Sequence, residues 1–243
     1  MDTKKVKFAN IIAHRGLSGI ERENTASAFV AAGNRRYKGI ETDVHLTADG
    51  KFIIIHNDDT EAVAGDKLSV ESTSYRTLRS LRLKDVDGTK DRADLIMPSL
   101  VEYIRICKRY GKQCVLEIKN AFPPAYVEEI AKVFDREEYF ENAIFISFCY
   151  DNLVSMRGYR RDATVQFLTD KMPDRELIGK LSKNTFDIDI QYKALTADAV
   201  KELHHSGIIV NCWTVDNPQD AERLAEYGVD YITSNILEPD FPL

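Results

Sequence analysis

The chain of 243 residues has no long hydrophobic run. No apolar stretch approaches the ~20 residues that a membrane-spanning helix needs. The charged residues 1–7 lead directly into the first apolar run and leave no room for the apolar segment of a signal peptide. We therefore expect a cytoplasmic protein without a stable membrane anchor.

Cysteine and excess positive charge are also scarce. The four cysteines are scattered and show no C-x-x-C spacing, which argues against a zinc site, so reduced thiols are expected. Lys and Arg number 33 against 39 Asp and Glu, for a net charge of −6. Because nucleic acids and anionic membranes attract basic surfaces, this balance argues weakly against both and predicts no nucleic-acid partner.

The chain does contain a regular alternation of apolar runs and helical patterns. The expected strands cover residues 8–14, 39–44, 113–118, 143–147, 163–168, 185–190, 208–213 and 229–233. The helical patterns between them cover residues 25–36, 99–110, 125–134, 150–159, 173–181, 196–206 and 218–227. This rhythm predicts an α/β protein, a (β/α)8 TIM barrel forming a single domain over residues 1–243. A doubly wound open sheet is the alternative, but no G-x-G-x-x-G loop follows the first strand.

One apolar run, residues 51–56, departs from this alternation. It follows the second strand after a turn containing Asp49-Gly50, which predicts a β-hairpin. Pairing at equal distances from that turn places His56 opposite Asp43. The polar residues that come next, at about 57–97, contain one helical pattern near 75–81 and are expected to form a small capping insertion at the active-site rim.

Polar side chains lie at the ends of several expected strands. These are His14, Arg15, Glu41, Asp43, His56, Glu117 and Lys119. Burying so many ionisable groups is tolerable only when they meet in one cleft and satisfy one another. Acids, imidazoles and cations in a common dry cleft suit metal-assisted attack on a phosphate ester.

The carboxylates suggest a cation site. Glu41 and Asp43 are two residues apart on a strand and point to the same face, and Glu117 and Lys119 repeat this spacing. Carboxylates within ~5 Å repel by several kcal/mol at an effective dielectric constant near 20. Either one of them stays protonated or a cation binds, and oxygen ligands favour Mg2+ or Ca2+ over Zn2+. Rim carboxylates paired with Arg or Lys remain the alternative.

His14 and His56 are candidates for acid/base catalysis, because imidazole titrates near neutral pH. Arg15 and Lys119 could bind a phosphate, and Gly16 could let the backbone approach it closely. The other three histidines are expected at turns or helix surfaces and receive no role; they are His45, His204 and His205.

Short motifs along the chain carry a family resemblance. They are His14-Arg15-Gly16, Glu23-Asn24-Thr25, Glu41-Thr42-Asp43-Val44, Leu46-Thr47-Ala48-Asp49-Gly50, Ile55-His56, Met97-Pro98-Ser99-Leu100, Leu116-Glu117-Ile118-Lys119, Cys212-Trp213-Thr214-Val215-Asp216 and Gly228-Val229-Asp230-Tyr231-Ile232-Thr233-Ser234-Asn235. In this order and spacing they resemble the glycerophosphodiester phosphodiesterase family, among the phosphatidylinositol-specific phospholipase C-like barrels. Asn57 departs from the family's usual Asp after the second histidine.

The resemblance implies roles for individual residues. It implies one divalent cation, Mg2+ or Ca2+, held by Glu41, Asp43 and Glu117. It implies acid/base catalysis by His14 and His56. It implies substrate binding by Arg15, Lys119 and Trp213, although Trp213 reads equally well as a core aromatic. Glu23 and Asn24 are expected to brace the site.

The reaction implied is hydrolysis of a small glycerophosphodiester to glycerol 3-phosphate and an alcohol. Two other functions remain open. One is a lysophospholipase D-type activity on lyso-lipids, which the polar insertion disfavours. The other is a barrel that binds a phosphodiester without turnover. The oligomeric state and the alcohol headgroup have no signature in the sequence.

Overall fold

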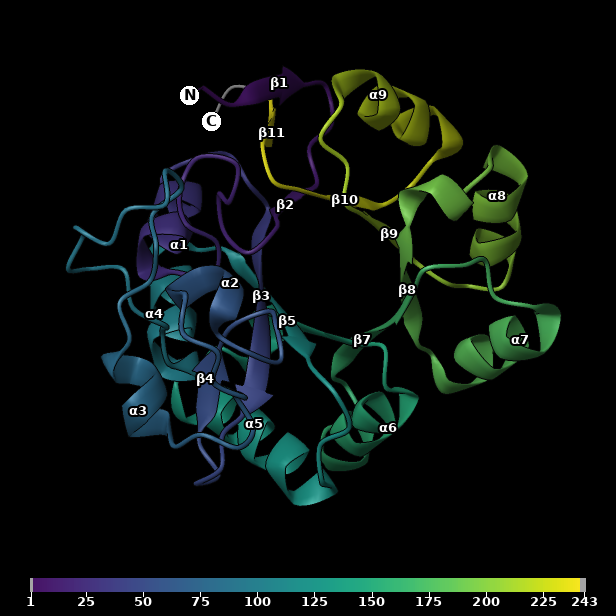
Figure 1. Ribbon diagram of the computed structural model, residues 1–243. Helices are drawn as coiled ribbons and strands as arrows, with labels where there is room; N and C mark the ends of the chain where they lie inside the picture. Colours follow the sequence, from purple (N-terminus) through teal and green to yellow (C-terminus); the bar gives the residue numbers. More distant parts are fainter. Residues whose placement is uncertain (1, 241–243) are drawn as a thin grey trace.

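The computed structural model describes residues 2–240, and within them eight parallel strands close into a barrel (Figure 1). In ring order the strands are β2 (Ile11–Ala13), β3 (Gly39–Leu46), β5 (Gln113–Ile118), β6 (Ala143–Ser147), β7 (Thr164–Thr169), β8 (Asp187–Gln191), β9 (Val210–Trp213) and β10 (Tyr231–Ser234). The first strand, β2, pairs with both β3 and β10. This closure confirms the predicted TIM barrel and rules out an open sheet.

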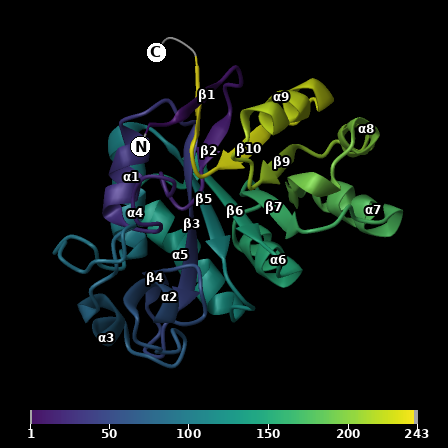
Figure 2. The same ribbon diagram turned by 45° about the horizontal axis from the view of Figure 1, so that its top comes forward.

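Helices surround the barrel, as Figures 1 and 2 show. They are α1 (Ala26–Gly33), α4 (Leu100–Tyr110), α5 (Pro124–Arg136), α6 (Tyr150–Tyr159), α7 (Arg175–Asn184), α8 (Ala197–His205) and α9 (Pro218–Tyr227), with single 3-10 turns at Phe140–Asn142 and Tyr192–Ala194. Local chemistry sets the ends of α4, where Ser99 and Glu102 form a capping box and Gly111 ends the helix with positive φ. None of the helices within residues 2–240 combines the length and apolar character needed to cross a bilayer.

The barrel interior contains both apolar and polar side chains. Its apolar cluster comprises Ile12, Val115, Ile144, Ile146 and Leu168. Alternate residues of a strand share a face, so the same strands also direct buried carboxyl, amide and hydroxyl groups inward. Active sites of this fold lie at the carboxyl ends of the strands, which is where the predicted site residues lie.

The ends of the described chain form a feature that the sequence did not predict. β1 (Lys4–Val6) pairs in parallel with β11 (Leu237–Pro239), outside the barrel. The first barrel strand was expected at residues 8–14, whereas β2 covers only Ile11–Ala13.

The predicted hairpin is present, but its register is one residue away from the expected one. β4 (Phe52–Ile54) is antiparallel to β3, with Leu46 opposite Phe52. The turn is therefore centred on Asp49 instead of between Asp49 and Gly50. As a result Ile55, not His56, lies opposite Asp43, and the Ile55 N–H donates to the Asp43 carbonyl at 3.2 Å.

The insertion at 57–97 contains α2 (Glu61–Ala64) and α3 (Tyr75–Ser80), of which only α3 was expected. It has its own apolar cluster, which includes Val63 and Leu78 and packs against the buried side chains of β4. The insertion lies beside the carboxyl end of β3 (Figure 2). Asn120, which follows β5, ties it to the rim by donating to Asp58 and Glu71 at 3.0 and 2.8 Å.

Candidate active site

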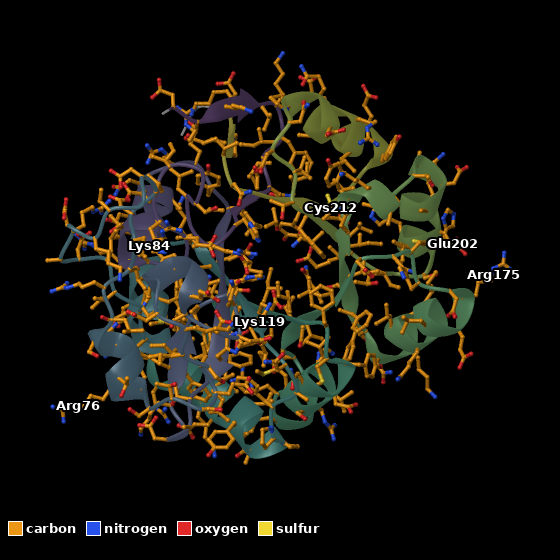
Figure 3. All side chains as sticks on the ribbon, in the orientation of Figure 1. Arg76, Lys84, Lys119, Arg175, Glu202 and Cys212 are labelled. Atoms are coloured by element: carbon orange, nitrogen blue, oxygen red, sulfur yellow. The ribbon has the colours of Figure 1, made fainter. Side chains whose placement is uncertain are left out.

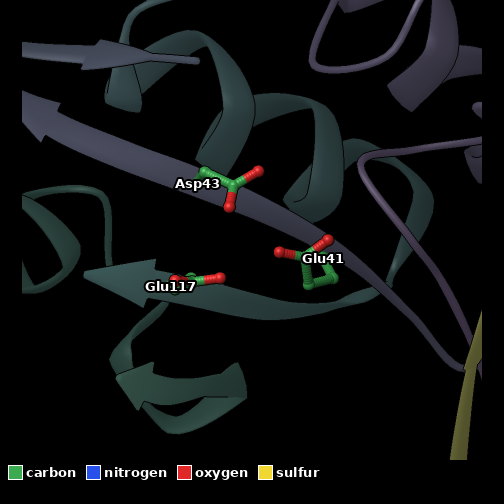
Figure 4. Close-up of side chains that lie close together, drawn as sticks. All are labelled: Glu41, Asp43 and Glu117. Carbon is green, nitrogen blue, oxygen red and sulfur yellow. The ribbon is translucent and has the colours of Figure 1, made fainter. Parts of the chain in front are cut away.

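Three buried carboxylates meet where β3 and β5 lie side by side. Glu41 and Asp43 share one face of β3, and the register of the two parallel strands places Asp43 beside Glu117. One oxygen from each of the three lies within 4.8 Å of the others (Figure 4). The carboxylates predicted from their spacing therefore form one cluster.

Burial and neighbouring charges give the three carboxyl groups different pKa values. Burial, and then the charge of Asp43, raise the pKa of Glu41 well above its usual value and that of Glu117 to about 7. Burial alone would also raise the pKa of Asp43, but the Arg15 guanidinium, together with His56, Lys119 and a hydrogen bond from Asn24, outweighs burial and lowers that pKa. Asp43 is thus the strongest acid of the cluster, and burial makes the two glutamates bind their protons more tightly than a carboxyl group in water does.

Two cations lie beside the cluster, each near a different oxygen of Asp43. Lys119 Nζ lies 2.9 Å from Glu117 Oε1 and 3.7 Å from Asp43 Oδ1. Arg15 Nε lies 3.7 Å from Asp43 Oδ2, and its backbone N–H donates to Glu41 at 2.8 Å. Figure 3 shows Lys119 near the centre of the ring, whereas Arg175 lies at its outer edge.

Hydrogen bonds to the first loop hold these groups in place. Asn24 donates to Asp43 Oδ2 at 2.8 Å, and Glu23 accepts from the Arg15 guanidinium at 3.1 Å. The expected bracing contacts are therefore present. Gly16 was expected to let the backbone approach a phosphate closely, but the structure requires glycine there because of its contact with α1. Its φ is +78°, and a Cβ would lie 2.7 Å from Ala28 of α1.

His14 is oriented by a chain of hydrogen bonds. Asn235 Nδ2 donates to the Asp216 carboxylate at 2.6 Å, which turns Asn235 Oδ1 towards His14 Nδ1 at 2.7 Å. Because that oxygen can only accept, Nδ1 carries the proton and Nε2 is left as the free acceptor, 4.0 Å from Glu41. Burial, assisted by Arg15, lowers the pKa of His14 to about 4, so the imidazole is neutral at pH 7.

His56 lines the same pocket as His14 despite the shifted register of its hairpin. Its Nδ1 lies 2.8 Å from Asn57 Oδ1, which again leaves Nε2 free. Burial lowers the pKa of His56. The two predicted acid/base candidates therefore both present an unprotonated Nε2 in their neutral forms.

A pocket of about 230 Å³ opens in front of these groups. One side carries His14, Arg15, Glu41, His56 and Glu117, and no residue of the insertion at 57–97 lines it. The other side is largely apolar, and its lining includes Ile146, Phe148, Leu168, Trp213 and Asp189. The Trp213 ring packs edge-on against Phe148 at 5.9 Å and is partly exposed, so it forms part of the pocket wall.

Buried polar residues that the sequence did not predict also lie here, among them His45 and Asp189. His45, expected at a turn or helix surface, is fully buried on β3, and its Nε2 lies 3.3 Å from the His56 carbonyl oxygen. Asp189 was not among the predicted site residues, although the alternation Asp187-Ile188-Asp189-Ile190 is typical of a strand with one polar face.

Comparison with known proteins agrees with this geometry. A family model described as "Glycerophosphoryl diester phosphodiesterase family" matches residues 14–238. The chain belongs to this family. Members of the glycerophosphoryl diester phosphodiesterase family are phosphoric diester hydrolases, and the chain is an enzyme of this class.

Relatives of the family cover almost the whole chain. The glycerophosphodiester phosphodiesterase of Caldanaerobacter subterraneus subsp. tengcongensis is 26% identical, over 93% of each chain. That of Bacillus subtilis is 27% identical, over 92% of this chain and 82% of the relative.

Solved structures share the fold. A Parabacteroides distasonis glycerophosphodiester phosphodiesterase is 26% identical, with a TM-score of 0.76 over 97% and 94% of the two chains. An Oleispira antarctica phosphodiesterase, solved in complex with the product sn-glycerol-3-phosphate, is 24% identical, with a TM-score of 0.84 over 93% of each chain.

Proposed function

We propose that this enzyme hydrolyses small glycerophosphodiesters to glycerol 3-phosphate and an alcohol with the help of one divalent cation. The observation that carries the proposal is the buried triad of Glu41, Asp43 and Glu117, flanked by two cations and two neutral imidazoles. Family membership supports the substrate class.

The carboxylates suit a hard cation. Asp43 Oδ1 is buried without a hydrogen-bond partner among the described residues, and burial together with the charge of Asp43 raises the pKa of both glutamates. An all-oxygen site of this kind fits Mg2+ or Ca2+ better than Zn2+. When bound, the cation would polarise a phosphoryl oxygen and acidify a nearby hydroxyl.

The protein's own groups divide the remaining work. Arg15 and Lys119 lie on either side of Asp43 and would bind the phosphate oxygens. His14 and His56 would act as the acid/base pair through their Nε2 atoms. One Nε2 accepts the proton of the attacking hydroxyl, and the other, once protonated, donates to the departing alkoxide. Trp213 would form the apolar wall beside the glycerol carbons.

The test is release of glycerol 3-phosphate from glycerophosphocholine and glycerophosphoethanolamine by purified protein in EDTA, Mg2+ or Ca2+. We expect release only with a divalent cation, and a loss of about 10²–10⁴-fold in kcat for His14→Ala. His205→Ala, on the exposed surface of α8, is the matched control and should leave the rate unchanged. Cation-independent release, or full activity of His14→Ala, would contradict the proposal.

One observation favours a second substrate class. Phe148 is 50% exposed beside Trp213, so the pocket has an apolar rim that could contact an acyl chain. The pocket of about 230 Å³, below the 300–1,000 Å³ common for larger ligands, favours the deacylated substrate. Lysophosphatidylcholine in the same assay distinguishes the two, because choline is released from both substrates but glycerol 3-phosphate only from the deacylated one.

A further inference from the structure

Asp189 is a buried acid that has no place in the proposed chemistry. It is 1% exposed and lines the pocket from β8. Its Oδ1 has no hydrogen-bond partner among the described residues. A buried polar group without a partner is costly, so its presence in a substrate pocket calls for an explanation.

The polar neighbours of Asp189 bond to one another instead. Asn211, beside it on β9, donates to Gln166 at 3.3 Å and accepts from Thr233 at 3.3 Å. Leu168, on the β7 side, is apolar. The Asp189 carboxyl therefore lines the pocket without a side-chain hydrogen bond to any described residue. Burial, and then the charge of Glu117, raise its pKa well above the usual value, which favours the protonated carboxyl, a group that can both donate and accept.

The position of Asp189 in the ring of strands indicates which part of a bound substrate it would contact. β8 is four strands from β3 in either direction, so Asp189 faces the strand that carries Glu41 and Asp43 across the barrel. A phosphate bound between Arg15 and Lys119 would extend its glycerol carbons past the Trp213 wall towards Asp189. The hydroxyl farthest from the phosphate is the one that reaches this side first.

We propose that Asp189 is a specificity-determining residue that hydrogen-bonds the free terminal hydroxyl of the glycerol unit and thereby selects deacylated glycerophosphodiesters over lyso-lipids. This inference rests on the proposed function and refines it. An acyl group on that hydroxyl removes its proton and adds a chain at the side of the pocket that Asp189 lines. The same carboxyl that binds the diol would thus disfavour the ester.

The experiment compares kcat/KM for glycerophosphoethanolamine with that for its analogue built on propane-1,2-diol, which lacks only the terminal hydroxyl. We expect the wild type to prefer the glycerol compound by roughly 10- to 100-fold. Asp189→Val should reduce this ratio to about 1, and Asp189→Asn, which still donates and accepts, should retain most of it. Asp187→Asn, on the same strand but outside the pocket lining, is the matched control.

The outcomes separate this inference from the proposed function. An unchanged ratio in Asp189→Val, or a wild type that does not discriminate, would overturn the role of Asp189 while leaving the reaction intact. If the wild type hydrolyses neither diester, the proposed reaction fails; calorimetric affinities for glycerol 3-phosphate and propane-1,2-diol phosphate then decide the role of Asp189. Equal affinities would overturn it, and a preference lost in Asp189→Val would support it. Replacing a buried unpaired acid by Val should not lower the melting temperature, which excludes misfolding as the cause.

Discussion

Replacing Glu117 by Gln should stabilise the metal-free protein at high pH. The pKa of Glu117 is raised from 4.5 to about 7, by burial and then by Asp43. Below pH ~4.5 the carboxyl is protonated in both the folded and unfolded states. Between pH ~4.5 and ~7 the unfolded chain releases this proton while the folded protein retains it, so stability falls as the pH rises.

The size of the effect follows from the same shift. At about 1.4 kcal/mol per pKa unit, this shift lowers the free energy of unfolding of the metal-free protein by about 3 kcal/mol above pH 7. The glutamine side chain would keep the shape of the protonated acid, with a carbonyl oxygen facing Lys119. For a chain of this length, 3 kcal/mol corresponds to about 6–12 °C in melting temperature.

The assay is thermal unfolding of the wild type, Glu117→Gln and the exposed control Glu176→Gln, in EDTA at pH 5 and pH 8. Glu117→Gln should melt well above the wild type at pH 8, with a much smaller difference at pH 5, and the control should change little at either pH. Added Mg2+ or Ca2+ should stabilise the wild type by about 2.7 kcal/mol at 100 times the Kd and the variant much less. A Glu117→Gln protein that melts at or below the wild type in EDTA at pH 8 would refute the reasoning.

Three further predictions concern other parts of the site. Burial lowers the pKa of His14 to about 4, so between pH 6.5 and pH 4 only the unfolded chain gains the proton. The stability of the metal-free protein should therefore fall by about 3 kcal/mol over this range. A pH series of melting curves should show that His14→Gln removes this loss. Asn57→Asp adds a negative charge beside His56 Nδ1 and should raise the pKa of His56, moving the acidic limb of the kcat/KM profile to higher pH; an unmoved limb would show that His56 does not control it. Gly16→Ala places a Cβ 2.7 Å from Ala28 at a positive φ and should lower the free energy of unfolding by at least about 1 kcal/mol. An unchanged midpoint of denaturant unfolding would contradict this.

Much of the fold was predictable because strand and helix patterns are local. The apolar run at 113–118 and the cap at Ser99 depend on residues a few positions apart, and β5 and α4 lie where these signals indicated. The separation of Glu41 and Asp43 by two residues placed both on one face of a strand for the same reason. The hairpin was also predictable from its turn residues, whereas its register depended on the turn's actual geometry.

The pairing of distant segments had no comparable signal. β1 and β11 are short, and each forms only against the other. His45 gave no hint of burial, because its environment comes from the His56 backbone and the insertion.

The sequence by itself determined which residues end the strands, and with them the chemical groups available for catalysis, because side-chain direction along a strand follows from its period of two. The tertiary structure decided which of these groups meet. Barrel closure placed Glu117 beside Asp43 and Asp189 across from β3, and burial in that closed ring set the pKa values of Glu117 and His14 apart from their usual ones. Distances across a barrel and loss of solvent are properties of the packed ring, so no local pattern of residues could have supplied them.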